Sequence, residues 1–161
     1  MKKEFKIVII SICVIIALTL CIYICIKPKL ITSDEFISNS KKLGYSCLKT
    51  NETISSTAIE FWKAQKDGYE INFHATMSNI EKRAKKSITD KHFEEIKEEY
   101  ENLKSPSSKE EYSSFNNFSK YSLTTEEFYI KVTKIDNTIM FAKVPIQYKD
   151  EIINFFEQLG Y

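Results

Sequence analysis

Residues 127–144, EFYIKVTKIDNTIMFAKV, decide the fold class, because they contain two strand-like runs separated by a short turn. The runs cover 127–135 and 138–144, and the dipeptide Asp136-Asn137 between them suits a tight turn. The sequence therefore predicts an antiparallel β-hairpin. Its apolar positions suit a half-buried sheet: they are Phe128, Ile130, Val132, Ile139 and Phe141.

Further strand-like runs precede this hairpin, and with it they predict one antiparallel sheet of about six strands. They cover 46–53, 56–65, 69–77 and 117–124, of which the first is the weakest. Lys66-Asp67-Gly68 is a hairpin signal, because glycine accepts a positive φ at no steric cost. In the run 69–77, Phe73 faces one side of the sheet and His74 the other.

Three or so helices are expected to pack on this sheet, which makes the fold class α+β. The first covers 33–43, where Thr32 and Glu35 have the spacing of a capping box and Gly44 follows as a C-cap. The last follows Pro145 and carries five residues of apolar character at helical spacing: Tyr148, Ile152, Phe155, Phe156 and Leu159.

The longest helix is predicted from Ser78, which has capping-box spacing with Glu81, to about Leu103. Basic residues gather near its N-terminal end and glutamates near its C-terminal end, an order that opposes the helix dipole. A break near 87–90 would relieve this opposition, so two shorter helices are an alternative. The predicted apolar face consists of Ile80, Ala84, Ile88, Ile96, Tyr100 and Leu103.

Two of the predicted helices have similar sequences. Residues 34–45, DEFISNSKKLGY, agree with residues 150–161, DEIINFFEQLGY, at six of twelve positions. The match is explained by two amphipathic helices with the same C-cap, the interpretation we favour, or by duplication of a strand-strand-strand-helix unit.

An uncleaved membrane anchor is predicted at residues 7–26, IVIISICVIIALTLCIYICI, twenty residues without charge, glycine or proline. As a helix it would span about 30 Å, the thickness of a hydrocarbon core. The chain thus divides into a cytoplasmic tail and transmembrane anchor at 1–26, a linker at 27–32 and an α+β domain at 33–161. Lipid bilayer is therefore an expected partner.

The short basic tail favours a cytoplasmic N-terminus and an extracytoplasmic domain, in a single-pass protein of the cell membrane. Lipidation at Cys21 is the less favoured alternative, because Leu20 is too bulky for a lipoprotein signal. Three of the four cysteines lie in the anchor, so the domain keeps only Cys47 and has no disulfide framework.

Composition excludes several function classes. Residues 27–161 carry 20 basic and 21 acidic side chains, so a nucleic-acid partner is not expected. Three scattered glycines cannot build a phosphate-binding loop, and His74 and His92 lack the spacing of metal ligands. We therefore expect no cofactor, no metal and no catalytic residues, and we expect both histidines to be solvated.

One nucleophilic site remains as a hypothesis, a thiolate–imidazole pair of Cys47 and His74. Membrane-anchored sortases use such chemistry, but their Thr-Leu-x-Thr-Cys motif is replaced here by Gly44-Tyr45-Ser46-Cys47, and their late arginine is missing. A buried, inert cysteine is the favoured interpretation.

The best candidates for an interaction surface are a basic cluster and a few aromatic residues. The cluster would suit anionic lipid head groups if it faced a membrane; otherwise it is a solvated helix face. Trp62 and the aromatic run 115–121 suit recognition of a partner. The basic cluster consists of Lys82, Arg83, Lys85 and Lys86.

Two segments carry a resemblance to known proteins. They are TSDEF…LGY at 32–45 and IDNT…YKDEI…LGY at 135–161, behind the N-terminal anchor. Over most of residues 31–161 the chain resembles small membrane-anchored or lipoprotein domains of unknown function from low-GC Gram-positive bacteria. The resemblance implies an extracytoplasmic α+β domain and no known activity, so no site residues carry over.

These observations favour a non-enzymatic binding module that recognises an unknown protein, peptide or envelope component. The alternatives are a thiol-dependent envelope enzyme that uses Cys47 and a small immunity or inhibitor protein.

Overall fold

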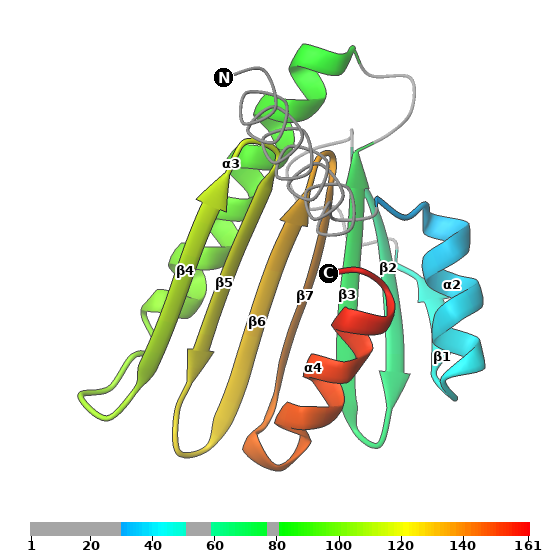
Figure 1. Ribbon diagram of the computed structural model, residues 1–161. Coiled ribbons are helices and arrows are strands. Elements are labelled where there is room, and N and C mark those ends of the chain that lie inside the picture. Colours follow the sequence, from blue (N-terminus) through cyan, green and yellow to red (C-terminus); the bar gives the residue numbers. More distant parts are fainter. Residues whose placement is uncertain (1–29, 51–58, 77–80) are drawn as a thin grey trace, which may run out of the picture.

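The computed structural model describes residues 30–50, 59–76 and 81–161. The part it describes is an α+β fold built on one antiparallel sheet of seven strands, in the order β1-β2-β3-β7-β6-β5-β4 (Figure 1). The strands are β1 (Ser46–Lys49), β2 (Ile59–Lys66), β3 (Tyr69–Thr76), β4 (Lys109–Phe115), β5 (Phe118–Thr124), β6 (Phe128–Ile135) and β7 (Thr138–Pro145).

The predicted hairpin at 127–144 is confirmed and lies at the centre of the sheet. β6 and β7 pair from Phe128↔Pro145 to Ile135↔Thr138, around a turn in which Asp136 has a φ of 52°. β7 also pairs with β3, which joins the meander β1-β2-β3 to the meander β4-β5-β6-β7.

The expected number of about six strands is one too few, because residues 109–115, which none of the predicted strand-like runs covers, form β4. All seven residues of β4 are exposed, so the strand has no buried face and shows no apolar alternation. Its pairing with β5 is nevertheless regular, from Lys109↔Thr124 to Phe115↔Phe118.

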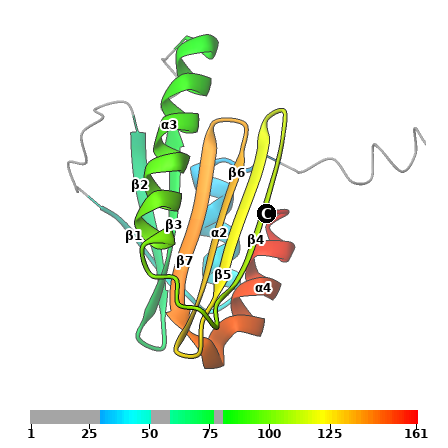
Figure 2. The ribbon, with the colours of Figure 1, turned by 90° about the vertical axis from the view of Figure 1, so that its left-hand side faces the viewer.

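In the described part of the chain, three helices cover both faces of the sheet, and a short 3-10 turn (Ile146–Tyr148) follows β7. α2 (Ser33–Lys42) and α4 (Lys149–Gln158) lie on one face, and α3 (Lys82–Glu101) lies on the other (Figure 2). The core therefore has two parts. One packs Phe36 and Phe156 against β3, β6 and β7, and the other packs Phe93 against β5, β6 and β7.

α3 is one continuous helix, so the alternative of two shorter helices is wrong. Its opposing charge order is offset by pairs one turn apart, including Lys86–Asp90 at 2.5 Å and Lys97–Glu101 at 2.9 Å. The predicted start at Ser78 lies outside the described residues. The buried face also differs from the expected one, since Ala84 is exposed; it consists of Thr89, His92, Phe93, Ile96 and Tyr100.

The shared sequence of α2 and α4 produces the same C-terminal turn in both helices. Gly44 and Gly160 have φ of 85° and 82°, which side chains other than glycine rarely adopt. The following Tyr45 and Tyr161 each donate a backbone hydrogen bond five residues back, at 3.0 and 2.7 Å. Because α2 precedes the first strand and α4 follows the last, the two helices do not occupy equivalent positions in two strand-strand-strand-helix units.

The predicted anchor at 7–26 lies outside the described residues. Within the described ranges, no helix has the length and apolar character needed to cross a membrane.

We expect Phe36→Ala to lower the free energy of unfolding by about 3–5 kcal/mol. Phe36 is fully buried, and its ring stacks on Phe73 with centroids 4.7 Å apart. Urea unfolding of the chain from residue 30 onward measures this, because both parts of the core lie within that piece. Phe115→Ala is the matched control, since Phe115 is 68% exposed and should change stability by less than about 0.5 kcal/mol. Equal losses in the two variants would contradict the packing described.

Candidate functional site

The structure does not bring Cys47 and His74 together. Cys47 on β1 pairs with Ala64 on β2, which pairs with Ile71 on β3, three residues from His74. Two strand spacings separate β1 from β3 by about 10 Å. Cys47 packs on the α2 face, whereas His74 points to α3, so the side chains also lie on opposite sides of the sheet. Burial raises the pKa of the Cys47 thiol, which disfavours the reactive thiolate.

A buried histidine pair joins α3 to the sheet. Nδ1 of His74 on β3 lies 2.8 Å from Nε2 of His92 on α3. Nδ1 of His92 lies 3.4 Å from a carboxylate oxygen of Glu95, which only accepts hydrogen bonds. If Nδ1 of His92 carries the proton toward Glu95, Nε2 is the acceptor, and Nδ1 of His74 donates to it.

The expectation that both histidines are solvated is wrong. His74 and His92 are 5% and 7% exposed, and the rings of Phe61 and Phe141 contact His74 edge-on. Burial, with His92 and Lys63 nearby, lowers the pKa of His74 to about 2. Burial also lowers the pKa of His92, against the opposing effect of Glu95. Both rings are therefore neutral at physiological pH, and the pair is a structural contact between helix and sheet.

The sequence held a signal for this contact. His92 lies four residues from both Ile88 and Ile96, so it continues the apolar stripe of the helix. His74 lies between Phe73 and Ala75 in a strand with buried residues on both faces. A half-buried strand would leave His74 in solvent. In the structure, α3 covers the second face of β3 and buries this side chain.

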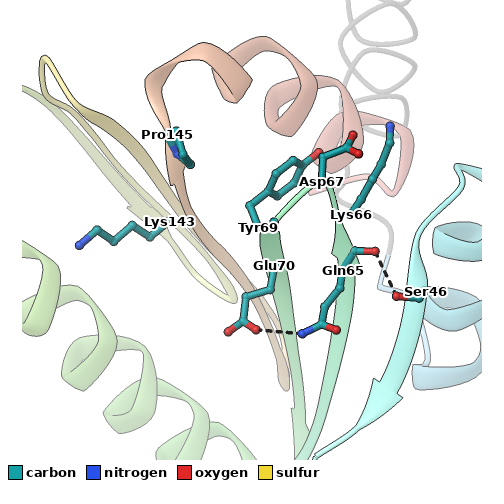
Figure 3. A pocket seen from close by; sticks show the side chains of 9 residues that line it. Ser46, Gln65, Lys66, Asp67, Tyr69, Glu70, Lys143 and Pro145 are labelled. Atoms are coloured by element: carbon teal, nitrogen blue, oxygen red, sulfur yellow. Dashed lines mark hydrogen bonds between the residues drawn. The ribbon is translucent and has the colours of Figure 1, made fainter.

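An open hollow of about 560 Å³ lies at the turn between β2 and β3 (Figure 3). Several of its polar groups have partners within the protein: Ser46 donates to the carbonyl of Gln65 at 3.2 Å, and the amide of Gln65 donates to Glu70 at 3.4 Å. The ammonium of Lys143 lies over the ring of Phe128, 4.6 Å from its centroid. Most of the polar side chains that line the hollow are therefore engaged within the protein, and we assign no ligand to it.

The residues predicted for an interaction surface lie on two different parts of the molecule. Trp62 lies on β2, is partly buried and packs against the core on the α2 face. The basic cluster occupies the first two turns of α3, on the other face. In the run 115–121 only the first residues are exposed at the turn, and Tyr121 is fully buried.

The outer edge of β4 is the feature best suited to bind another chain. β4 is the last strand of the sheet, and none of its seven residues is buried. The two-residue turn after Phe115 closes on a hydrogen-bonded pair, so alternate residues direct their backbone N–H and C=O groups away from β5. These are Glu110, Tyr112 and Ser114. The other edge strand, β1, has only four residues and contacts α2.

No family model, no curated protein and no solved structure matches this chain.

We expect stability to fall as the pH drops below about 6.5. The folded protein holds both imidazoles neutral, with pKa values below the ordinary one, whereas the unfolded chain takes up protons from that pH downward. Each histidine then lowers the free energy of unfolding by up to about 1.4 kcal/mol per pH unit. Urea unfolding between pH 7 and pH 5 measures the slope.

The double variant His74→Asn/His92→Gln should have a much flatter slope over the same range, because the amide nitrogen of one side chain can donate to the amide oxygen of the other and neither group titrates. Carboxylates contribute equally to both proteins. Parallel pH profiles would show that the histidine pair does not govern the loss.

Proposed function

We propose that this chain is a non-enzymatic binding module of the cell envelope, which recognises an extended segment of a partner protein at the outer edge of β4. The exposed, unpaired edge is the observation that supports the proposal. A row of free backbone N–H and C=O groups is a template for an added strand. Natural edge strands are usually shortened, bulged, interrupted by proline or charged. β4 is a regular seven-residue strand without proline, and its charged residues are confined to its first three positions.

The side chains of β4 indicate the chemistry of the partner segment. Glu110 and Glu111 lie near its start; Glu110 pairs with Lys104 at 2.6 Å, and Glu111 has no ion pair within the described ranges. Tyr112 is 50% exposed and Phe115 is 68% exposed. A segment with a basic residue opposite the glutamates and apolar residues opposite the two rings would complement this edge. Self-pairing about Tyr112 would instead place each glutamate opposite an uncharged serine.

The proposed location is the outer face of the membrane, with residues 7–26 as the anchor and the N-terminus in the cytoplasm. The uniform apolar character and length of this segment support it. A thiol enzyme that uses Cys47 has less support, because the thiol lacks an imidazole neighbour and its pKa is raised.

We expect a photo-crosslinking residue at Tyr112 of the full chain to form an adduct with one protein in the cells that produce it. Ser114→Pro should abolish this adduct, because proline removes one of the outward N–H groups while remaining acceptable in an edge strand. Ser114→Ala is the matched control: it loses the same hydroxyl contact to Ser119, at 2.9 Å, and keeps the N–H group. Gel mobility and mass spectrometry of the adduct measure the outcome.

Three results would overturn this proposal: no adduct, an adduct that the proline leaves unchanged, or an adduct consisting of two copies of this chain. A second crosslinking position at Lys91, 80% exposed at its side chain on α3, should form no adduct with the same partner.

A further inference from the structure

The first two turns of α3 carry an exposed cluster of positive charge. Lys82, Arg83 and Lys86 are exposed, and Lys85 is partly so. Neither Lys82 nor Arg83 has an ion-pair partner in the described part of the chain, whereas Lys86 pairs with Asp90 at 2.5 Å. The helix also has no acidic residue in its first turn and no side-chain N-cap. This end of α3 therefore presents cations to its surroundings.

The basic end projects beyond the sheet. The hydroxyl of Thr89 lies 2.8 Å from that of Thr76, the last residue of β3. The helix then runs down the sheet, so residues 82–88 lie past its end (Figure 2). Seven helical residues correspond to an overhang of about 10 Å.

The chain enters the domain at this same end of the sheet. Tyr161 is held there because its hydroxyl contacts that of Thr138, the first residue of β7, and the backbone of Ile31. Ser33 donates to Glu60, near the start of β2, at 3.4 Å. Figure 1 shows the beginning of α2 and the beginning of α3 at one end of the molecule.

The distances place the projecting helix end within reach of a bilayer. If the anchor ends at Ile26, the four steps to Leu30 span at most about 14 Å. The head-group layer adds about 5–8 Å outside the hydrocarbon core. Leu30 then lies no more than roughly 9 Å outside the head groups, a gap that the overhang of α3, about 10 Å, closes.

We infer that the N-terminal end of α3 binds the anionic head groups of the membrane that anchors the chain. The contact uses Lys82, Arg83 and Lys86, and it rests on the proposed anchor. On the α3 side, the exposed N-cap residue Glu81 is outnumbered by the four basic residues that follow it, and Asp90 is engaged by Lys86 and Lys134. Two further acidic residues at this end of the sheet lie on the α2 side: Glu35 closes the capping box and Glu60 accepts from Ser33. The sheet separates them from the basic cluster, so the two charges do not cancel.

Hydrogen exchange of the full chain in lipid nanodiscs tests this inference. The discs contain phosphatidylcholine alone or with added phosphatidylglycerol. Amides of residues 85–92 should exchange about tenfold or more slowly in the anionic discs, because each basic residue near an anionic surface adds roughly a fivefold preference. High salt should remove the difference.

The variant Lys82→Gln/Arg83→Gln/Lys86→Gln should lose this protection. Lys41→Gln/Lys42→Gln/Lys109→Gln, with the same change of charge at the opposite end of the sheet, should retain it. Equal exchange in the two kinds of disc overturns the lipid contact, and so does protection that persists in the first variant. A chain that remains in solution without entering discs overturns the anchor, and this inference falls with it.

Discussion

The pairing of β3 with β7 is the constraint on which the rest of the structure depends. It joins two meanders that are separated in sequence by α3, through central pairs such as Phe73↔Met140 and Ile71↔Ala142, all fully buried. Because the pairing places these strands side by side, α2 and α4 share one face over them: the ring of Phe155 contacts those of both Phe36 and Tyr45. Without this pairing, neither helix would have a complete apolar surface to cover.

On the other face, polar contacts fix the position of α3 along the sheet. Thr89 bonds to Thr76, His92 to His74, and Asp90 to Lys134 on β6, which is only 5% exposed. Apolar packing alone tolerates small shifts of a helix, but a shift here would leave several buried polar groups without partners, at about 1–3 kcal/mol each. The overhang of α3 is therefore a defined feature of the fold, set by hydrogen bonds to residues at or near the ends of β3 and β6.

Local signals in the sequence were sufficient for most elements. The capping box of Thr32 and Glu35 is present, the glycine caps have positive φ, and the turns at 66–69 and 135–138 close as expected. Each of these features depends on only a few neighbouring residues, so it can be predicted from the amino-acid sequence alone. β4 could not be found in this way, since a wholly exposed strand has no apolar alternation, and its regular pairing with β5 joins it to the sheet. The packing of α3 on the second face of β3 is likewise a tertiary property, so the sequence pattern of the strand did not predict that His74 is buried.

The two proposed contacts are compatible because the fold separates them. The long axes of the strands extend from the end of the sheet at which the chain enters to the opposite end. An anchored domain would therefore hold its sheet upright on the membrane. β4 lies six strand spacings from β1, or about 29 Å, on the margin opposite α2. An extended partner segment added to β4 would therefore run along the membrane normal and would not pass between the domain and the bilayer. Binding of lipid at α3 would restrict the domain's rotation about its linker and keep this edge exposed to partners in the envelope.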